Sequence, residues 1–414
     1  MPYARPALAL ALAALLAACS GGGAPAEPQP PPIDLARPGD ALYAEAVRHY
    51  DAAVLAEAQA TSALQAGDAA LAQQRLATAA AGYGLARATF DRLPAEFPAS
   101  IRLDQAAYFA GRCSYELGMI SGLAGDLLDA RARLEAMIAA FPGSLLLDHA
   151  RYVDGRAIFL LASLPAPGAD QTFAAARAAF LASLARAPRG TYADDAQYWL
   201  GRAWFEEGFA LANVVPSPAP GTAEFAAAKA DLQAAEAALA AVPASFPTST
   251  LADNARYFLG QSYYMEPVDT TAGRTERIAR LRDAVASLSL VVGTSSPFAA
   301  GARYWRGKSH YALAFDLAVG LVKDQAELAL AVADLPAVPP PSVYADNALY
   351  WLAKCFMHVE PAPACAGGAA APPSSGCAAL AALQLLVASD PSYAASTYPA
   401  QAVAYLSTHA CTCP

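Results

Sequence analysis

A recurring pattern constrains the fold of this chain more than any other feature. It reads "FPTSTLADNARYFLGQSYY" at residues 246–264 and returns as "FPASIRLDQAAYFAGRCSY", "FPGSLLLDHARYVDGRAIF", "APRGTYADDAQYWLGRAWF" and "PPSVYADNALYWLAKCF". Six copies align on a tyrosine, with spacings of 44, 46, 59, 47 and 46 residues: Tyr108, Tyr152, Tyr198, Tyr257, Tyr304 and Tyr350. A near-constant period in this range predicts a stacked array of helix pairs.

The first helix of each copy carries small and acidic residues at fixed places. An aspartate stands four residues before the tyrosine in five copies, where it would face the positive end of the helix dipole: Asp104, Asp148, Asp194, Asp253 and Asp346. The serines before them are predicted N-caps: Ser100, Ser144, Ser249 and Ser342. Glycine three residues after the tyrosine costs a helix about 1 kcal/mol relative to alanine, so its recurrence predicts tight packing against a neighbouring helix. These glycines are Gly111, Gly155, Gly201, Gly260 and Gly307.

The second helix of each copy ends at a proline and has one apolar stripe, spaced four and three residues apart. The stripes are Ala130, Leu134 and Met137 before Pro142; Ala176, Phe180 and Ser183 before Pro188; and Ala379, Leu383 and Leu386 before Pro391. A similar stripe through Ala86, Phe90 and Leu93 predicts one more helix pair ahead of the first tyrosine copy. With 56% apolar and 15% charged residues and much alanine, the composition suits packed helices, and the predicted fold class is all-α with six to seven helix pairs.

The N-terminus predicts export and a lipid anchor. Arg5 precedes the apolar run "PALALALAALL", and "LAAC" resembles the lipobox of bacterial lipoproteins, in which Cys19 would be acylated after removal of residues 1–18 as a signal peptide. The alternative is an ordinary secretory signal. Ser20 after Cys19 implies the outer membrane, with the protein facing the periplasm. Residues 19–39 form a Gly/Pro-rich tether, and no later apolar run of transmembrane length is free of charges.

The repeats resemble the tetratricopeptide (TPR) family over about residues 40–410. "GRCSYELG" and "GRAWFEEG" are similar to the Gly-to-Gly stretch of the TPR first helix, although the period exceeds the usual 34 residues and four copies lack the second glycine. The resemblance implies a right-handed superhelical solenoid of antiparallel helix pairs over residues 40–358. A Cys/Pro/Gly-rich loop at 359–377 and a terminal helix pair with a Cys-rich tail at 378–414 would follow.

The longer period resembles the TPR-bearing outer-membrane lipoproteins of the BamD type and the YbgF (CpoB) cell-division coordinator. This resemblance implies a scaffold for protein–protein interactions in cell-envelope assembly or organisation. Its partners would be an outer-membrane barrel or a peptidoglycan-associated complex. The alternative is an outer-membrane glycan- or nutrient-binding lipoprotein that uses its tyrosines as stacking platforms.

Residues spaced three and four apart on the first helices share one face, which forms the concave wall in TPR-like arrays. The candidate partner-binding residues are Tyr108, Tyr152, Arg156, Tyr198, Arg202, Tyr257, Tyr304, Lys308 and Tyr350. Tyrosines flanked by cations on an acidic protein suit an extended peptide or an acidic segment. In the alternative, the aromatic rings pack between helices and the cations pair with nearby carboxylates, which we favour for Arg112 and Lys354.

The cysteines besides Cys19 are concentrated near the C-terminus. In an oxidising compartment, disulfides are predicted among Cys355, Cys365, Cys377, Cys411 and Cys413, with connectivity left open. A zinc site that also draws on His358 and His409 is the alternative. Cys113, beside a packing glycine, is predicted to be a buried thiol.

Catalytic motifs are scarce. "GARYWRGKS" at 301–309 has five residues between its glycines where a phosphate-binding loop needs four, and neither G-x-S-x-G nor H-E-x-x-H occurs. We therefore predict no enzyme, no cofactor and no metal. A helical-array lytic transglycosylase would need a further catalytic domain, for which the repeats leave no room. The net charge of −9 argues against a nucleic-acid partner.

Overall fold

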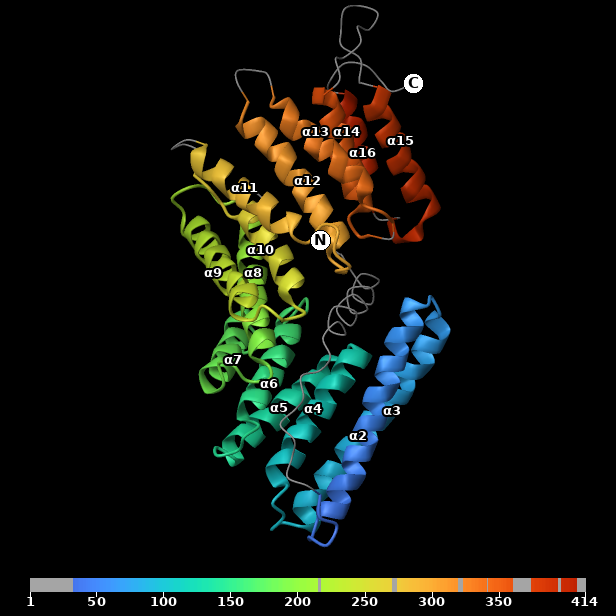
Figure 1. The fold of residues 1–414 in the computed structure, drawn as a ribbon, viewed down its shortest axis with the longest axis vertical. Coiled ribbons are helices and arrows are strands. Elements are labelled where there is room, and N and C mark those ends of the chain that lie inside the picture. Colours follow the sequence, from blue (N-terminus) through green and yellow to red (C-terminus); the bar gives the residue numbers. More distant parts are fainter. Residues whose placement is uncertain are drawn as a thin grey trace, which may run out of the picture. The chain divides into compact units, whose positions relative to one another are not determined.

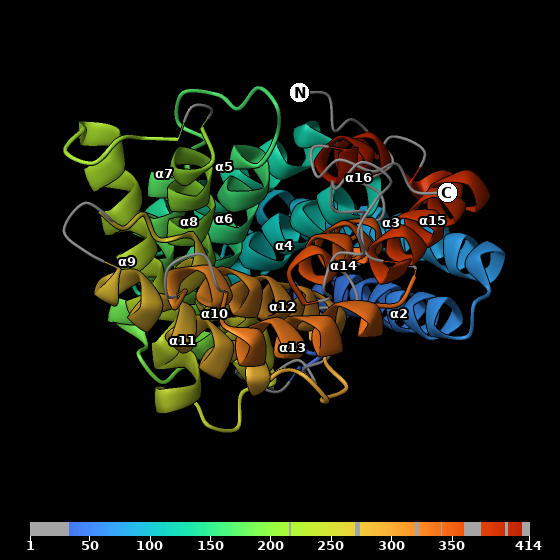
Figure 2. The ribbon, with the colours of Figure 1, turned by 90° about the horizontal axis from the view of Figure 1, so that it is seen from above.

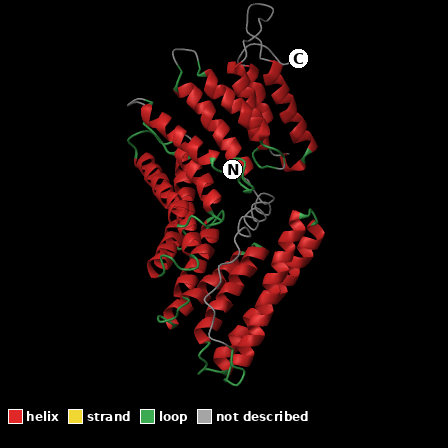
Figure 3. Ribbon diagram, in the orientation of Figure 1, coloured by secondary structure: helices red, strands yellow, loops and turns green. Residues whose placement is uncertain are grey.

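The computed structural model describes residues 33–214, 217–269, 274–318, 323–340, 342–359, 374–393 and 396–407. Every regular element in these ranges is a helix, which confirms the all-α prediction (Figures 1 and 3). None of the described helices is both long and apolar enough to cross a bilayer. The signal peptide, Cys19 and most of the tether lie outside the described residues, as does most of the 359–377 loop.

The chain forms two compact units. Unit 1 comprises Met1–Glu207 and Ala237–Ala252, and unit 2 comprises Gly208–Glu236 and Asp253–Pro414. The boundary runs through two helices, α8 (Ala193–Ala212) and α9 (Ala223–Ser245), so each unit receives part of both.

In unit 1, helices that follow one another in sequence pack side by side (Figure 1). They are α2 (Asp40–Gln65), α3 (Ala69–Glu96), α4 (Leu103–Ser121), α5 (Ala124–Ala140), α6 (Leu147–Ala162) and α7 (Phe173–Arg186). The first helices of two consecutive pairs, α4 and α6, also touch. The α2–α3 hairpin is the additional helix pair predicted ahead of the first tyrosine copy.

Unit 2 is likewise built from a succession of helices (Figure 2). They are α10 (Ala252–Met265), α11 (Thr275–Ser289), α12 (Ala299–Asp316), α13 (Gln325–Asp334), η2 (Leu335–Ala337), α14 (Ala345–Val359), α15 (Ser374–Ser389), η3 (Pro391–Tyr393) and α16 (Tyr398–Ser407). From α11 to α15 each α-helix packs on the next, and α16 packs on both α14 and α15. Helix α15 begins at Ser374, ahead of the boundary expected at residue 378.

The packing glycines meet the apolar stripes, as predicted. A Cβ atom placed on Gly111 would come within 2.8 Å of Leu134, the central residue of its partner's stripe. The corresponding distances are 2.7 Å from Gly155 to Phe180 and 2.5 Å from Gly260 to Leu288. The stripe side chains in α3, α5 and α7 are at most 3% exposed. Each pair is therefore held by an apolar side chain resting directly on the backbone of the facing helix.

The serine prediction was wrong in its geometry. Helices α4 and α6 begin three residues after Ser100 and Ser144, and their N-caps are Arg102 and Leu146, which make no side-chain cap bond. Each serine hydroxyl instead accepts a hydrogen bond from the backbone N–H two residues later, at 3.2 Å from Arg102 and 3.1 Å from Leu146. Each connection is a turn that the serine hydroxyl stabilises, and it precedes the helix. Asp104 and Asp148 lie in the first turns of α4 and α6, as predicted.

A buried ion pair fastens the start of α2 to the turn between α3 and α4. Asp40 and Arg102 are both 0% exposed, and the guanidinium donates two hydrogen bonds, Nε to Oδ1 at 3.1 Å and Nη2 to Oδ2 at 3.2 Å. The Arg102 guanidinium also lies 5.2 Å from the centre of the Tyr43 ring, and Asp34 N donates to Asp40 at 2.9 Å. Hydrogen bonding from Arg102 lowers the pKa of Asp40.

Replacing Arg102 by methionine should destabilise unit 1 by about 3–5 kcal/mol, because the Asp40 carboxylate would stay buried without its cation. Hydrogen exchange of the α2 and α3 amides measures the loss. Arg92→Met, which breaks an exposed pair with Glu96, is the control and should change little. The pKa of Asp40 is lower in the folded state than its ordinary value of 3.8. The stability that the ionised Asp40 contributes is therefore present at neutral pH, and it is lost as the pH falls from 3.8 through the lower pKa of the folded state. Equal effects of the two variants would contradict the assignment.

Two glycines of α3 provide a matched test of helix contact. A Cβ on Gly82 would lie 2.9 Å from Ala53 Cβ and 3.3 Å from its Cα, whereas one on Gly84 would meet nothing within 4 Å. Gly82→Ala should therefore destabilise unit 1 by about 1–3 kcal/mol, because α2 must move. Gly84→Ala should stabilise it by about 0.5–1 kcal/mol through helix propensity. Thermal unfolding compares them, and a shift of the same sign for both would refute the contact.

Candidate interaction surface

The predicted tyrosines lie inside the helix stack. Tyr108, Tyr152, Tyr198, Tyr257 and Tyr304 are between 0% and 5% exposed, and Tyr350 is half-buried. The burial therefore agrees with the alternative in which the rings pack between helices. A partner could reach only the edge or the hydroxyl of each ring. Replacing Tyr198 or Tyr257 by alanine would open a cavity in the core.

Three of the tyrosines stack on an aromatic ring at the entrance to the next first helix. Tyr152 stacks on Tyr192 with ring centres 4.7 Å apart, and Tyr304 stacks on Tyr344 at 4.8 Å. Tyr257 stacks on Phe298 at 4.7 Å. The sequence analysis missed these partners. Their signal is an aromatic residue six positions before the tyrosine of the following copy.

The predicted cations lie one helical turn beyond the tyrosines and cover aromatic rings. Arg156 lies 3.9 Å from the centre of the Trp199 ring and donates to the Tyr152 hydroxyl at 2.9 Å. Arg202 donates to the Tyr198 hydroxyl at 3.3 Å. On the face predicted from helical spacing, Arg156 and Arg202 of unit 1 therefore lie against aromatic side chains.

Carboxylates neutralise two of the unit 1 cations. Arg112 is paired with Glu116 at 2.7 Å, as the packing alternative expected, and Arg202 is paired with Glu206. In both pairs the carboxylate stands four residues after the arginine on the same helix. This side of unit 1 therefore supplies part of its own counter-charge.

Unit 2 contains a different arrangement around Lys308. Its ammonium lies 4.4 Å from the Trp305 ring centre and 5.2 Å from that of Trp351, with Tyr264 at 5.0 Å and Tyr304 at 5.4 Å. Among the residues that the structure describes, it makes no ion pair and no hydrogen bond. We call Lys308 and these four rings the lysine cradle.

A second lysine adjoins the lysine cradle. Lys354 lies 4.2 Å from the Trp351 ring centre and 5.4 Å from that of Tyr311. Burial, reinforced by the positive charge of Lys354, lowers the pKa of Lys308 to about 8. The lysine cradle therefore holds a cation at appreciable electrostatic cost, which a bound anion would relieve.

Trp305 adds a second donor to the lysine cradle. Its indole Nε1 is buried and has no hydrogen-bond partner among the described residues. Buried donors of this kind normally have an acceptor. Oxygen acceptors, such as those of a carboxylate, would complement both the ammonium and the indole.

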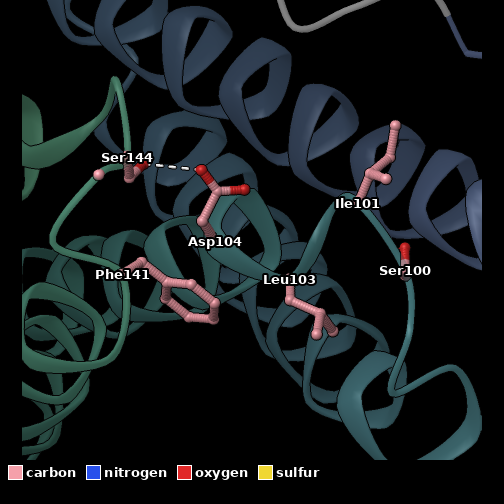
Figure 4. Close-up of a pocket in the computed structure, with 7 residues that line it drawn as sticks. Ser100, Ile101, Leu103, Asp104, Phe141 and Ser144 are labelled. Carbon is pink, nitrogen blue, oxygen red and sulfur yellow. Dashed lines mark hydrogen bonds between the residues drawn. The ribbon is translucent and has the colours of Figure 1, made fainter.

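A surface pocket opens between consecutive turns of unit 1 (Figure 4). It has a volume of about 360 Å³ and is lined by Ser100, Ile101, Leu103, Asp104, Phe141, Gly143 and Ser144. At its side the Ser144 hydroxyl donates to Asp104 Oδ2 at 2.7 Å, which ties the α5–α6 turn to the first turn of α4. The sequence analysis did not predict this pocket.

Buried carboxyl groups occur in both units away from the predicted face. Burial, then the charge of Glu116, raises the pKa of Glu57 to about 7, and the Tyr83 hydroxyl donates to Glu57 at 2.8 Å. Burial, then Glu266, raises the pKa of Glu236 to about 8, while Arg280 bonds Glu236 at 3.0 Å and pairs with Glu266 at 2.5 Å. The raised pKa values let each acid bind a proton closer to neutral pH, which lowers the cost of its burial.

The cysteines divide into two kinds. Cys113 and Cys355 are free and fully buried, so Cys113 is the buried thiol predicted and Cys355 is not part of a disulfide. Cys355 differs from the expectation because α14 turns it into the helix packing. Cys377 is disulfide-bonded, whereas Cys365, Cys411 and Cys413 lie outside the described residues. Within the described ranges, no group of three or more histidine, cysteine or acidic residues is placed to hold a metal ion.

No protein-family model matches this chain, and no curated protein matches it. The TPR resemblance and the roles it implies therefore rest on the residues quoted from the sequence.

The four lysines of the chain allow a direct measurement of the lysine cradle. Acylation of Lys308, followed by peptide mass spectrometry, should rise with pH around 8, below the 10.5 of an ordinary lysine, because only the neutral amine reacts. Lys354→Gln should move this curve to higher pH by removing a repelling charge. Lys229→Gln, at a lysine paired with Glu276, is the control and should leave the curve in place. A Lys308 midpoint near 10.5 would contradict the cradle.

Proposed function

We propose that this chain is a lipid-anchored, non-enzymatic scaffold of the bacterial cell envelope. Its helix pairs form a TPR-like right-handed solenoid, and one face of the first helices binds an extended protein segment. The partner belongs to an envelope machine such as an outer-membrane barrel or a peptidoglycan-associated complex. Acylation of Cys19 holds the protein at the outer membrane, facing the periplasm.

The order of helix contacts supports the repeat architecture. In each unit the contacts join neighbours in sequence, with additional contacts between alternate helices, α4 with α6 and α12 with α14. Quasi-one-dimensional packing of this kind is typical of helical repeat proteins. The glycine-to-stripe contact recurs at Gly111, Gly155 and Gly260.

The lysine cradle carries the binding proposal. An ammonium that is surrounded by rings, repelled by a second lysine and unpaired among the described residues lacks the counter-charge that Arg112 and Arg202 have. A glutamate or aspartate side chain of a partner would supply it, while its backbone and apolar side chains would lie along the rings. The lysine cradle of unit 2 therefore supports the proposal of an acidic partner segment.

Burial of the tyrosines favours a protein partner over a glycan. A sugar-stacking platform needs an open ring face, and the faces of Tyr152, Tyr257 and Tyr304 are covered by rings of the next copy. Cations cover the neighbouring tryptophans. The glycan- or nutrient-binding alternative remains as an outcome of the experiment.

Affinity purification of the tagged, lipidated chain from gently solubilised native membranes tests the proposal. Wild type should recover an envelope protein in stoichiometric amount, and a Lys308→Gln, Lys354→Gln double variant should lose most of it because the acidic segment loses its cations.

Lys229→Gln is the matched control, because it removes a lysine of unit 2 that is already paired with Glu276. It should retain the partner, and all variants should show wild-type thermal unfolding. Equal recovery with the double variant would overturn the lysine cradle as the binding site. Recovery of the chain alone would favour the glycan- or nutrient-binding alternative.

A further inference from the structure

One edge of unit 1 gathers the start of α2 and the turns between second and first helices. Gly39, which precedes α2, packs against the α3–α4 turn: a Cβ added to it would lie 3.1 Å from both Phe97 Cβ and Ser100 Oγ. The Asp40–Arg102 pair holds the same two segments together, and the Asp104–Ser144 bond adds the α5–α6 turn. We call this the turn edge of unit 1.

The turn edge exposes large aliphatic side chains. Ile101 and Leu145 occupy equivalent positions, each directly after the turn serine, and are 59% and 80% exposed. Ile33 and Leu35 flank Asp34, which is bonded to Asp40, and are 42% and 69% exposed. The 360 Å³ pocket separates Ile101 from the α5–α6 turn. Exposed aliphatic side chains gathered along one edge indicate a surface that a further apolar medium covers.

The position of the predicted lipid anchor along the sequence indicates that this surface faces a bilayer. Cys19 lies only 14 residues before Ile33 along the sequence. Fourteen residues span at most about 50 Å even when fully extended. A lipid anchor at Cys19 therefore brings the bilayer close to the turn edge, at which the tether enters the fold.

The charged side chains of the turn edge indicate which lipids it would contact. Asp34 is exposed at the turn edge, and Asp104 lines its pocket. Arg102 is fully buried and already paired, so it offers no charge to the surface. Asp34 is paired with the exposed Arg37 at 3.5 Å, so the edge presents aliphatic side chains with a balanced ion pair, which suits a zwitterionic lipid surface.

We propose that the turn edge of unit 1 lies against the bilayer that holds the lipid anchor, with Ile33, Leu35, Ile101 and Leu145 in contact with the lipid. The inference rests on the lipid anchor of the proposed function and adds a fixed orientation to it. Unit 1 would then be docked on the membrane by its edge, and not suspended freely on its tether.

Quenching of introduced tryptophans by brominated lipid tests the orientation. Leu145→Trp places a reporter on the turn edge. Leu123→Trp is the matched control, because Leu123 is also 62% exposed but lies in the turn between α4 and α5, at the opposite ends of the same helices. Full-length lipidated chains are reconstituted into vesicles of phosphatidylethanolamine and brominated phosphatidylcholine. The emission added by each new tryptophan is measured relative to the parent chain.

The Leu145→Trp emission should be largely lost and the Leu123→Trp emission retained. Equal quenching at both positions would mean that unit 1 tumbles on its tether, and absence of quenching at both would mean that it is held away from the bilayer; either result overturns the inference. Mass spectrometry of the Cys19 peptide and vesicle flotation check the anchor separately. An unacylated chain that does not float would refute the anchor and the orientation together, whereas a floating chain with equal quenching refutes the orientation alone.

Discussion

Contact between a glycine of one helix and the central apolar side chain of the next determines how closely each pair can approach. At Gly111, Gly155 and Gly260, a Cβ atom would lie 2.5–2.8 Å from the facing side chain, so the backbone forms part of the core. Alanine supplies much of the remaining interior, as at Ala106, which is 2% exposed. A core built from small residues gains little per side chain, and it therefore requires close approach repeated along the array.

Aromatic rings then connect successive repeats within each unit. A tyrosine in one first helix stacks on the ring at the entrance of the next, as Tyr304 does on Tyr344, and a cation one turn further covers a tryptophan. The arrangement buries the faces of the rings between helices. It also explains why a residue can belong to the predicted binding face and still be required for folding.

The sequence was sufficient for the helix pairs, the stripes and the packing glycines, because each follows from local periodicity repeated several times. It could not show that the serine turns precede the helices, since Ser100 fits both an N-cap and a turn until the backbone is known. The Asp40–Arg102 pair joins residues 62 positions apart, which no periodicity relates. Helical spacing brought Arg156 and Lys308 onto the predicted face, but the rings of Trp199 and Trp351, which belong to the following repeats, were missed.

Cys113 and Cys355 place one fully buried free thiol in each unit. Burial raises the pKa of both to about 12, so neither forms a reactive thiolate while its unit is folded. In an oxidising compartment this protection has a kinetic meaning, because each opening of a unit exposes a sulfur that can be oxidised or cross-linked before the helices close again. Oxidation or cross-linking of Cys113 would therefore report that unit 1 has opened, and that of Cys355 would report the same for unit 2.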